Sequence, residues 1–127
     1  MLSAIISIKP RYAELILNGE KTVEFRKSTC IAQKLYIYAA APEKKIIGKC
    51  RVADWRQGSP DVIWNVFGSY GGITHDEFNA YYAGRNTAFA YILTDVKRYD
   101  VPQPLSAFGV KRAPQFFCYV GLNYDHN

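Results

Sequence analysis

Three stretches in the first half of the chain alternate apolar and polar side chains with a period of two, and only short connections separate them. In the first stretch, Val23 and Phe25 fall on one face and Glu24 and Arg26 fall on the other. This period is typical of strands with one buried face, and short connections favour antiparallel pairing. The stretches cover residues 20–27, 34–41 and 45–54. The alternation therefore predicts a β-rich core whose second face can line a groove.

The residues around these stretches predict three short helices and further strands. Pro10 suits the first turn of a helix that ends at Gly19. Ser59 suits the N-cap of a second helix, and Thr74 with Glu77 fits the capping box of a third. Apolar runs that predict the remaining strands cover residues 2–8, 87–96 and 116–122. The predicted order is strand, helix, three strands, two helices and two strands.

Length and composition bound the class of protein. With 127 residues, of which 49% are apolar and 21% charged, the chain can form one domain over residues 1–127. The element order favours an α+β fold, a small mixed β-barrel flanked by short helices. No apolar run approaches the ~20 residues of a membrane span, and the N-terminus lacks the basic region of a signal peptide. We therefore expect a cytoplasmic protein with no membrane partner.

Metal-ligating residues are scarce. The three cysteines match no zinc-binding spacing, and the chain has only two histidines. We therefore predict no metal site and no cofactor.

A cluster of charged residues near the N-terminus is the main candidate for a site. Glu24 and Arg26 lie two residues apart, so their side chains share one face of the strand. Arg26 offers a planar fork of donors for phosphate or base edges, and Lys9 and Lys21 add compact positive charge. Glu24 can act as a hydrogen-bond acceptor or a general base. The net charge of +5 favours polyanionic partners, whereas a plain surface ion pair between Glu24 and Arg26 is the alternative.

The alternation does not place Lys21 by itself. If the strand ran straight from Gly19, Lys21 would point to the same face as Val23, away from Glu24. A turn or bulge near Gly19 can redirect it. Both orientations are open at the level of the sequence.

The charged residues form a pattern with their neighbours. G-x-K-x-x-E-x-R at residues 19–26 follows S-I-K-P-x-Y-A at residues 7–13. The pattern resembles the ASCH domain of the PUA-like superfamily, and the likeness continues through KIIGKC and residues 114–119. The resemblance implies a β-barrel with the motif on the floor of a cleft, and it implies RNA, a nucleotide or a nucleoside as the partner. The ligand-binding residues expected from the motif are Lys9, Lys21, Glu24 and Arg26.

A different class of function is implied by one branch of the family. That branch resembles small metal-independent amidohydrolases of acylated cytidine, in which a Thr nucleophile stands where this chain has Glu24. Thr22 is two residues from that position. If this chain is a hydrolase, we expect Lys21 and Glu24 to be catalytic by activating water, with Arg26 binding the oxyanion. Cleavage of RNA in the same basic cleft is the other hydrolytic alternative.

Further residues are candidates for the mouth of the cleft. The resemblance places the loop around Tyr70 there, and an aromatic ring can stack on a base. Gln115, at the entry to the last strand, can read a base edge or cap the loop. By contrast, we expect Trp64 in the core of its helix and His75 at a solvated position.

Overall fold

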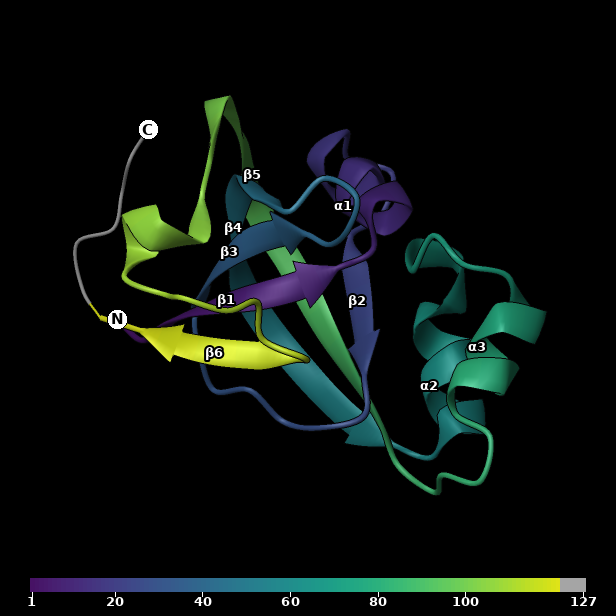
Figure 1. The fold of residues 1–127 in the computed structure, drawn as a ribbon. Coiled ribbons are helices and arrows are strands. Elements are labelled where there is room, and N and C mark those ends of the chain that lie inside the picture. The colour runs from purple at the N-terminus through teal and green to yellow at the C-terminus, as the bar shows by residue number, and fades with distance from the viewer. Residues whose placement is uncertain (122–127) are drawn as a thin grey trace.

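A computed structural model describes residues 1–121, so the end of the predicted strand 116–122 lies outside the described residues. The strands are β1 (Ser3–Ile8), β2 (Val23–Arg26), β3 (Lys34–Ala39), β4 (Lys45–Gly58), β5 (Ala88–Gln103) and β6 (Phe117–Val120). The helices are α1 (Pro10–Leu17), α2 (Pro60–Phe67) and α3 (His75–Tyr81), with 3-10 turns η1 (Gly68–Tyr70) and η2 (Leu105–Phe108). The predicted order of strands and helices is confirmed (Figure 1).

The six strands form one mixed sheet in the order β2-β5-β4-β3-β1-β6. β1 and β3 are parallel, and the other neighbours are antiparallel, including the predicted β3–β4 pair. No pairing between β2 and β6 closes the sheet within residues 1–121, because these two strands are its edges. The mixed α+β class is therefore confirmed, whereas closure into a barrel stays a prediction.

The antiparallel pairing expected of β2 with the next strand is wrong. β2 pairs with β5 instead, with Val23 opposite Ile92. The connection from β2 to β3 is not a tight turn, because it buries Cys30 and Ala32. The hydroxyl of Tyr91 on β5 accepts a hydrogen bond from Cys30 N at 2.9 Å and fixes this connection across the sheet.

The predicted helix boundaries follow from their caps. Ser59 Oγ accepts a hydrogen bond from Val62 N, and Thr74 with Glu77 makes both bonds of the capping box. Gly19, directly after α1, has a φ of +86°, a conformation that favours glycine. No helix in the described residues is long and apolar enough to cross a membrane.

β2 is buried on both faces, which positions the charged cluster. Val23 and Phe25 pack with Ile63 of α2 and Phe78 of α3 in one apolar cluster. Glu24 and Arg26 alternate to the opposite face, where their neighbours on β5 are Tyr91 and Phe89. In Figure 1, α2 and α3 lie together beside β2, and α1 lies at one end of the sheet. The alternation predicted for this strand is confirmed.

Candidate functional site

A cleft of about 570 Å³ opens between β1, the start of α1, β2 and α3. Five of the six residues predicted from the sequence line it, and these are Lys9, Lys21, Glu24, Arg26 and Gln115. Tyr70 does not line this cleft. The structure therefore brings together residues from opposite ends of the chain, from Lys9 to Gln115.

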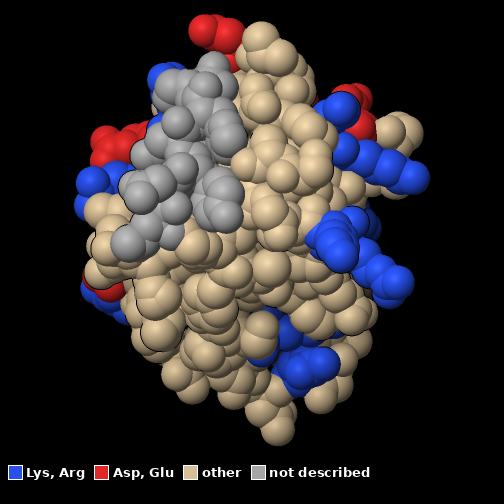
Figure 2. Space-filling view, turned by 60° about the vertical axis from the view of Figure 1, so that its left-hand side comes forward, with Lys and Arg blue, Asp and Glu red and all other residues tan. Residues whose placement is uncertain are grey.

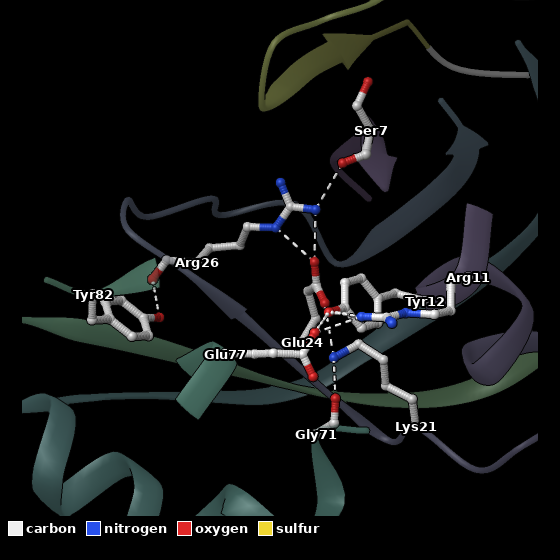
Figure 3. Close-up of polar contacts among 9 residues, drawn as sticks. All are labelled: Ser7, Arg11, Tyr12, Lys21, Glu24, Arg26, Gly71, Glu77 and Tyr82. Atoms are coloured by element: carbon white, nitrogen blue, oxygen red, sulfur yellow. Dashed lines mark hydrogen bonds and ion pairs between the residues drawn. The ribbon is translucent and has the colours of Figure 1, made fainter. Parts of the chain in front are cut away.

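The floor of the cleft is a buried network of three charges (Figure 3). Glu24 Oε1 lies 3.1 Å from Lys21 Nζ, and Glu24 Oε2 lies 2.6 Å from Arg26 Nη2. Arg26 Nε also donates to Glu24 Oε2 at 2.7 Å. The three side chains are between 2% and 10% exposed. The alternative of a solvated surface pair is therefore wrong, because the pair is buried and includes a second cation.

Lys21 reaches Glu24 because the strand begins later than the sequence suggested. β2 starts at Val23, so its alternation does not extend back to Lys21. The backbone before it is held by α1 and η1, since Lys21 N donates to Leu15 O and Thr22 N donates to Tyr70 O. Of the two orientations left open by the sequence, the one in which a turn near Gly19 redirects Lys21 toward Glu24 is confirmed, because Gly19 has a φ of +86° and Lys21 pairs with Glu24.

Gly71 supplies a further partner of Lys21. Its carbonyl accepts a hydrogen bond from Lys21 Nζ. A Cβ at Gly71 would lie 2.1 Å from Phe25 Cε2, so only glycine allows this close approach. Gly71 therefore links two parts of the site, because its backbone packs on the Phe25 ring and its carbonyl binds the Lys21 ammonium.

We expect Gly71→Ala to destabilise the domain by about 1–3 kcal/mol, because the added methyl overpacks the site against the Phe25 ring. Urea unfolding measures this effect. Gly58→Ala is the matched control, since its Cβ would make only ordinary contacts at 3.6 Å. Equal stability of the two variants would contradict the close packing of Gly71 on Phe25.

Arg26 joins β2 to β1 across the cleft. Its Nη2 donates to Ser7 O at 2.7 Å, and the Tyr82 hydroxyl donates to Arg26 O at 2.7 Å. Within residues 1–121, Arg26 Nη1 makes no hydrogen bond. The guanidinium is therefore fixed on one side and has donors for an acceptor in the cleft on the other.

The carboxyl of Glu24 is held in its charged form. Burial favours the neutral acid, but the charges and hydrogen bonds of Arg26 and Lys21 outweigh burial and hold the pKa below its ordinary value of 4.5. Both carboxylate oxygens are occupied by these cations. Glu24 is thus suited to orient Lys21 and Arg26 and is a poor acceptor for a proton from water.

Tyr12 and Glu77 form a second polar wall that the sequence interpretation missed. The Tyr12 hydroxyl donates to Glu77 Oε2 at 2.6 Å, and Arg11 pairs with the same oxygen. The Tyr12 and Arg11 side chains and the capping box at Thr74 lower the pKa of Glu77 to about 2. Tyr12 stood in the pattern at residues 7–13, but Glu77 was explained by its helix cap alone. Its second role follows only from the packing of α3 against α1.

The remaining predicted residues lie at the rim or away from the cleft. Lys9 and Gln115 are exposed on the rim. The Tyr70 side chain is 55% exposed, and its contribution is the backbone carbonyl that binds Thr22 N. Trp64 is only half-buried, and it stacks on exposed His75 with ring centroids 4.5 Å apart. His75 is thus at the surface as predicted, but it has an aromatic partner.

Charge is unevenly distributed over the molecule. Lys and Arg side chains gather along the right-hand and lower parts of the face shown in Figure 2, with few acidic groups among them. In the cleft, Lys9, Lys21 and Arg26 face the carboxylates Glu24 and Glu77. No group of three or more His, Cys, Asp or Glu residues within the described residues can hold a metal ion.

Comparisons with known proteins agree with this fold. The family model described as "Domain of unknown function (DUF365)" matches residues 1–111. An ASCH domain-containing ribonuclease of Zymomonas mobilis is 32% identical over 95 residues, which are 72% of this chain and 64% of that protein. The large ribosomal subunit protein uL22 of Ureaplasma parvum serovar 3 is 29% identical over 119 residues, which are 91% of this chain and 38% of that protein. The chain thus spans less than two thirds of the length of these curated relatives.

A solved structure is similar over nearly the whole chain. The crystal structure of ASCH from Zymomonas mobilis has a TM-score of 0.89 and 26% sequence identity, and it covers 96% of this chain and 90% of that one. The residues matched by the family model include β1, α1 and β2, which hold the charged floor of the cleft. With the sequence match and the fold in agreement, this chain belongs to the DUF365 family and is an ASCH domain.

Proposed function

We propose that this ASCH domain binds single-stranded RNA or a nucleotide in the cleft above Lys21, Glu24 and Arg26. The observation that carries the proposal is the buried network on the cleft floor. Burying two cations and one carboxylate is costly and contributes little net stability compared with apolar packing. Buried charges that line a cleft are typical of functional sites. The network leaves a net positive charge, which suits a phosphate.

The donors of the network fit an anionic ligand. Arg26 is oriented by Glu24 and the Ser7 carbonyl, so its Nη1 group is preorganised for an acceptor. Lys21 has three N–H donors, of which Glu24 and Gly71 engage two. Lys9 on the rim adds a third positive charge where a nucleic-acid backbone would leave the cleft. RNA is supported as the partner by the relative from Zymomonas mobilis, whose name includes ribonuclease.

Salt dependence of binding tests this proposal. We expect single-stranded RNA to bind with a log–log salt slope of about −0.7 for each phosphate contact, because bound cations displace counterions. Lys9→Ala should reduce the slope by about 0.7 while the fold is retained, since Lys9 is exposed. A fluorescence anisotropy titration between low and moderate salt measures both values. Absence of binding at low salt for RNA, DNA and nucleotides alike would overturn the proposal.

Cleavage of RNA in the same cleft is the second candidate, and the name of the Zymomonas mobilis relative favours it. Lys21 and Arg26 are placed to stabilise negative charge on a phosphate. Both carboxylates of the cleft, Glu24 and Glu77, have lowered pKa values and are engaged by other residues. General-base catalysis by Glu24 is therefore less favoured than binding, and the amidohydrolase alternative depends on that step.

A further inference from the structure

A groove of about 890 Å³ lies beside the cleft, between α1, α2 and the start of α3. The groove and the cleft share two wall residues, Ile73 and Glu77. The groove and the cleft therefore adjoin at these two residues. The proposed function uses none of the groove's other residues.

The groove contains a preformed aromatic platform. The rings of Trp64 and His75 are stacked, with 4.5 Å between centroids and 2° between planes. Trp64 is fixed from within, because it packs on Phe78 and because its ring lies so close to Gly68 that a Cβ there would be 2.6 Å from Trp64 Cδ2. His75 is exposed above it. The imidazole is thus held flat on a rigid support, and it is exposed where it lines the groove.

The polar groups around the platform suit a nucleotide. Arg11, on the wall between the groove and the cleft, is 67% exposed and binds Tyr12 and Glu77 through Nη2 alone. Its other guanidinium nitrogens can bind a linking phosphate. Asn65 and Ser69 are exposed on the α2 side and offer donors and acceptors for a base or sugar.

We propose that this groove is a second nucleotide subsite, in which the base next to the one in the cleft stacks on His75. The proposal rests on the proposed binding of RNA in the cleft and extends it from one nucleotide to two or more. Aromatic platforms of this kind bind single-stranded nucleic acid with little sequence preference, because every base has a π-face. The groove adjoins the cleft and shares Ile73 and Glu77 with it, which favours a polynucleotide over a separate protein partner.

The test compares a long ligand with a short one. A fluorescein-labelled octamer of randomised single-stranded RNA spans both sites, whereas a nucleoside monophosphate fills the cleft alone. We expect His75→Ala to weaken octamer binding by about 5- to 150-fold, the usual effect of losing one base stack, and to leave monophosphate binding unchanged. His75→Phe should retain octamer binding, because it keeps a flat ring. Asn79→Ala, an exposed change on α3 outside the groove, is the matched control.

A direct signal comes from the imidazole itself. The chain has only two histidines, so the His75 ring protons can be assigned with the His75→Ala variant. They should shift upfield with the octamer and not with the monophosphate. If His75→Ala binds the octamer as tightly as the wild type while Lys21→Met does not, the second subsite is wrong and the proposed function stands. If the wild type binds neither ligand, the proposed function fails and the subsite fails with it.

Discussion

Glu24→Gln is expected to lower the free energy of unfolding by about 3–5 kcal/mol, the usual cost of removing one partner from a buried ion pair. The substitution keeps the shape of the side chain but leaves Lys21 and Arg26 as two buried cations without a counter-charge. Urea unfolding at neutral pH measures the loss. Glu14→Gln is the matched control, because Glu14 pairs with Arg98 at the surface, where both side chains are about half exposed. That pair should contribute no more than about 1 kcal/mol.

The source of the loss can be separated from a general packing defect. In the double variant Glu24→Gln/Lys21→Met, one of the unpaired cations is gone, so part of the lost stability should return. A packing defect would instead make the two costs add. Equal stability losses for Glu24→Gln and Glu14→Gln would show that the network on the cleft floor is not buried as described.

The stability difference should also depend on pH in a defined direction. The pKa of Glu24 in the folded protein lies below its ordinary value of 4.5, because Arg26 and Lys21 outweigh the effect of burial. Its stabilising contribution is therefore complete above about pH 4.5 and is lost as the pH falls through the lowered pKa. The amide introduced by Glu24→Gln does not titrate, so the difference in unfolding free energy between wild type and this variant should narrow on acidification. A difference that widens below pH 4.5 would contradict this sign.

The sequence predicted the parts of the fold that local chemistry decides. The capping box at Thr74, the N-cap at Ser59 and the end of α1 before Gly19 depend on a few adjacent residues, and all three are confirmed. The pairing of β2 depends on where the 27–33 connection runs, and that is set by a distant hydroxyl on Tyr91. No local pattern carries this information, so the expected pairing was wrong.

In the candidate site, too, the sequence predicted the residues placed by local pattern and not those placed by distant contacts. Alternation placed Glu24 and Arg26 on one face of β2, because both lie within the strand. Lys21 lies before the strand, and its position depends on backbone partners at Leu15 and Tyr70 that only the folded chain brings close. Glu77 was missed as a wall of the cleft, because its sequence neighbours explain it fully as a helix cap. A residue that has both a local role and a long-range role is hard to find from the sequence, because the local role already accounts for its presence.

Lys21→Met is expected to weaken the binding of single-stranded RNA by about 10- to 100-fold, because it removes a charge-assisted donor from the buried floor of the cleft. The methionine is close in size to the lysine stem, and Glu24 keeps Arg26 as its partner, so the variant should fold. Anisotropy titration, with circular dichroism as the check on folding, measures the affinity. Lys27→Met is the matched control for net charge, since Lys27 is on the same chain segment but does not line the cleft.

The same variant distinguishes a binding module from an enzyme. If the cleft also cleaves RNA, Lys21→Met should lower the rate at saturating RNA by about 100-fold or more, because the ammonium stabilises charge in the transition state. Glu24→Gln, assayed on RNA and on acylated cytidine below its unfolding temperature, tests the general-base alternative, for which the rate would fall by about 100-fold with little change in affinity. If the domain only binds, the wild type has no turnover on either substrate, and both variants change affinity alone. If Lys21→Met binds RNA as tightly as the wild type, the charged floor of the cleft is not part of the RNA-binding site. Lys21 is the cation that the loop backbone and Gly71 hold beside Glu24.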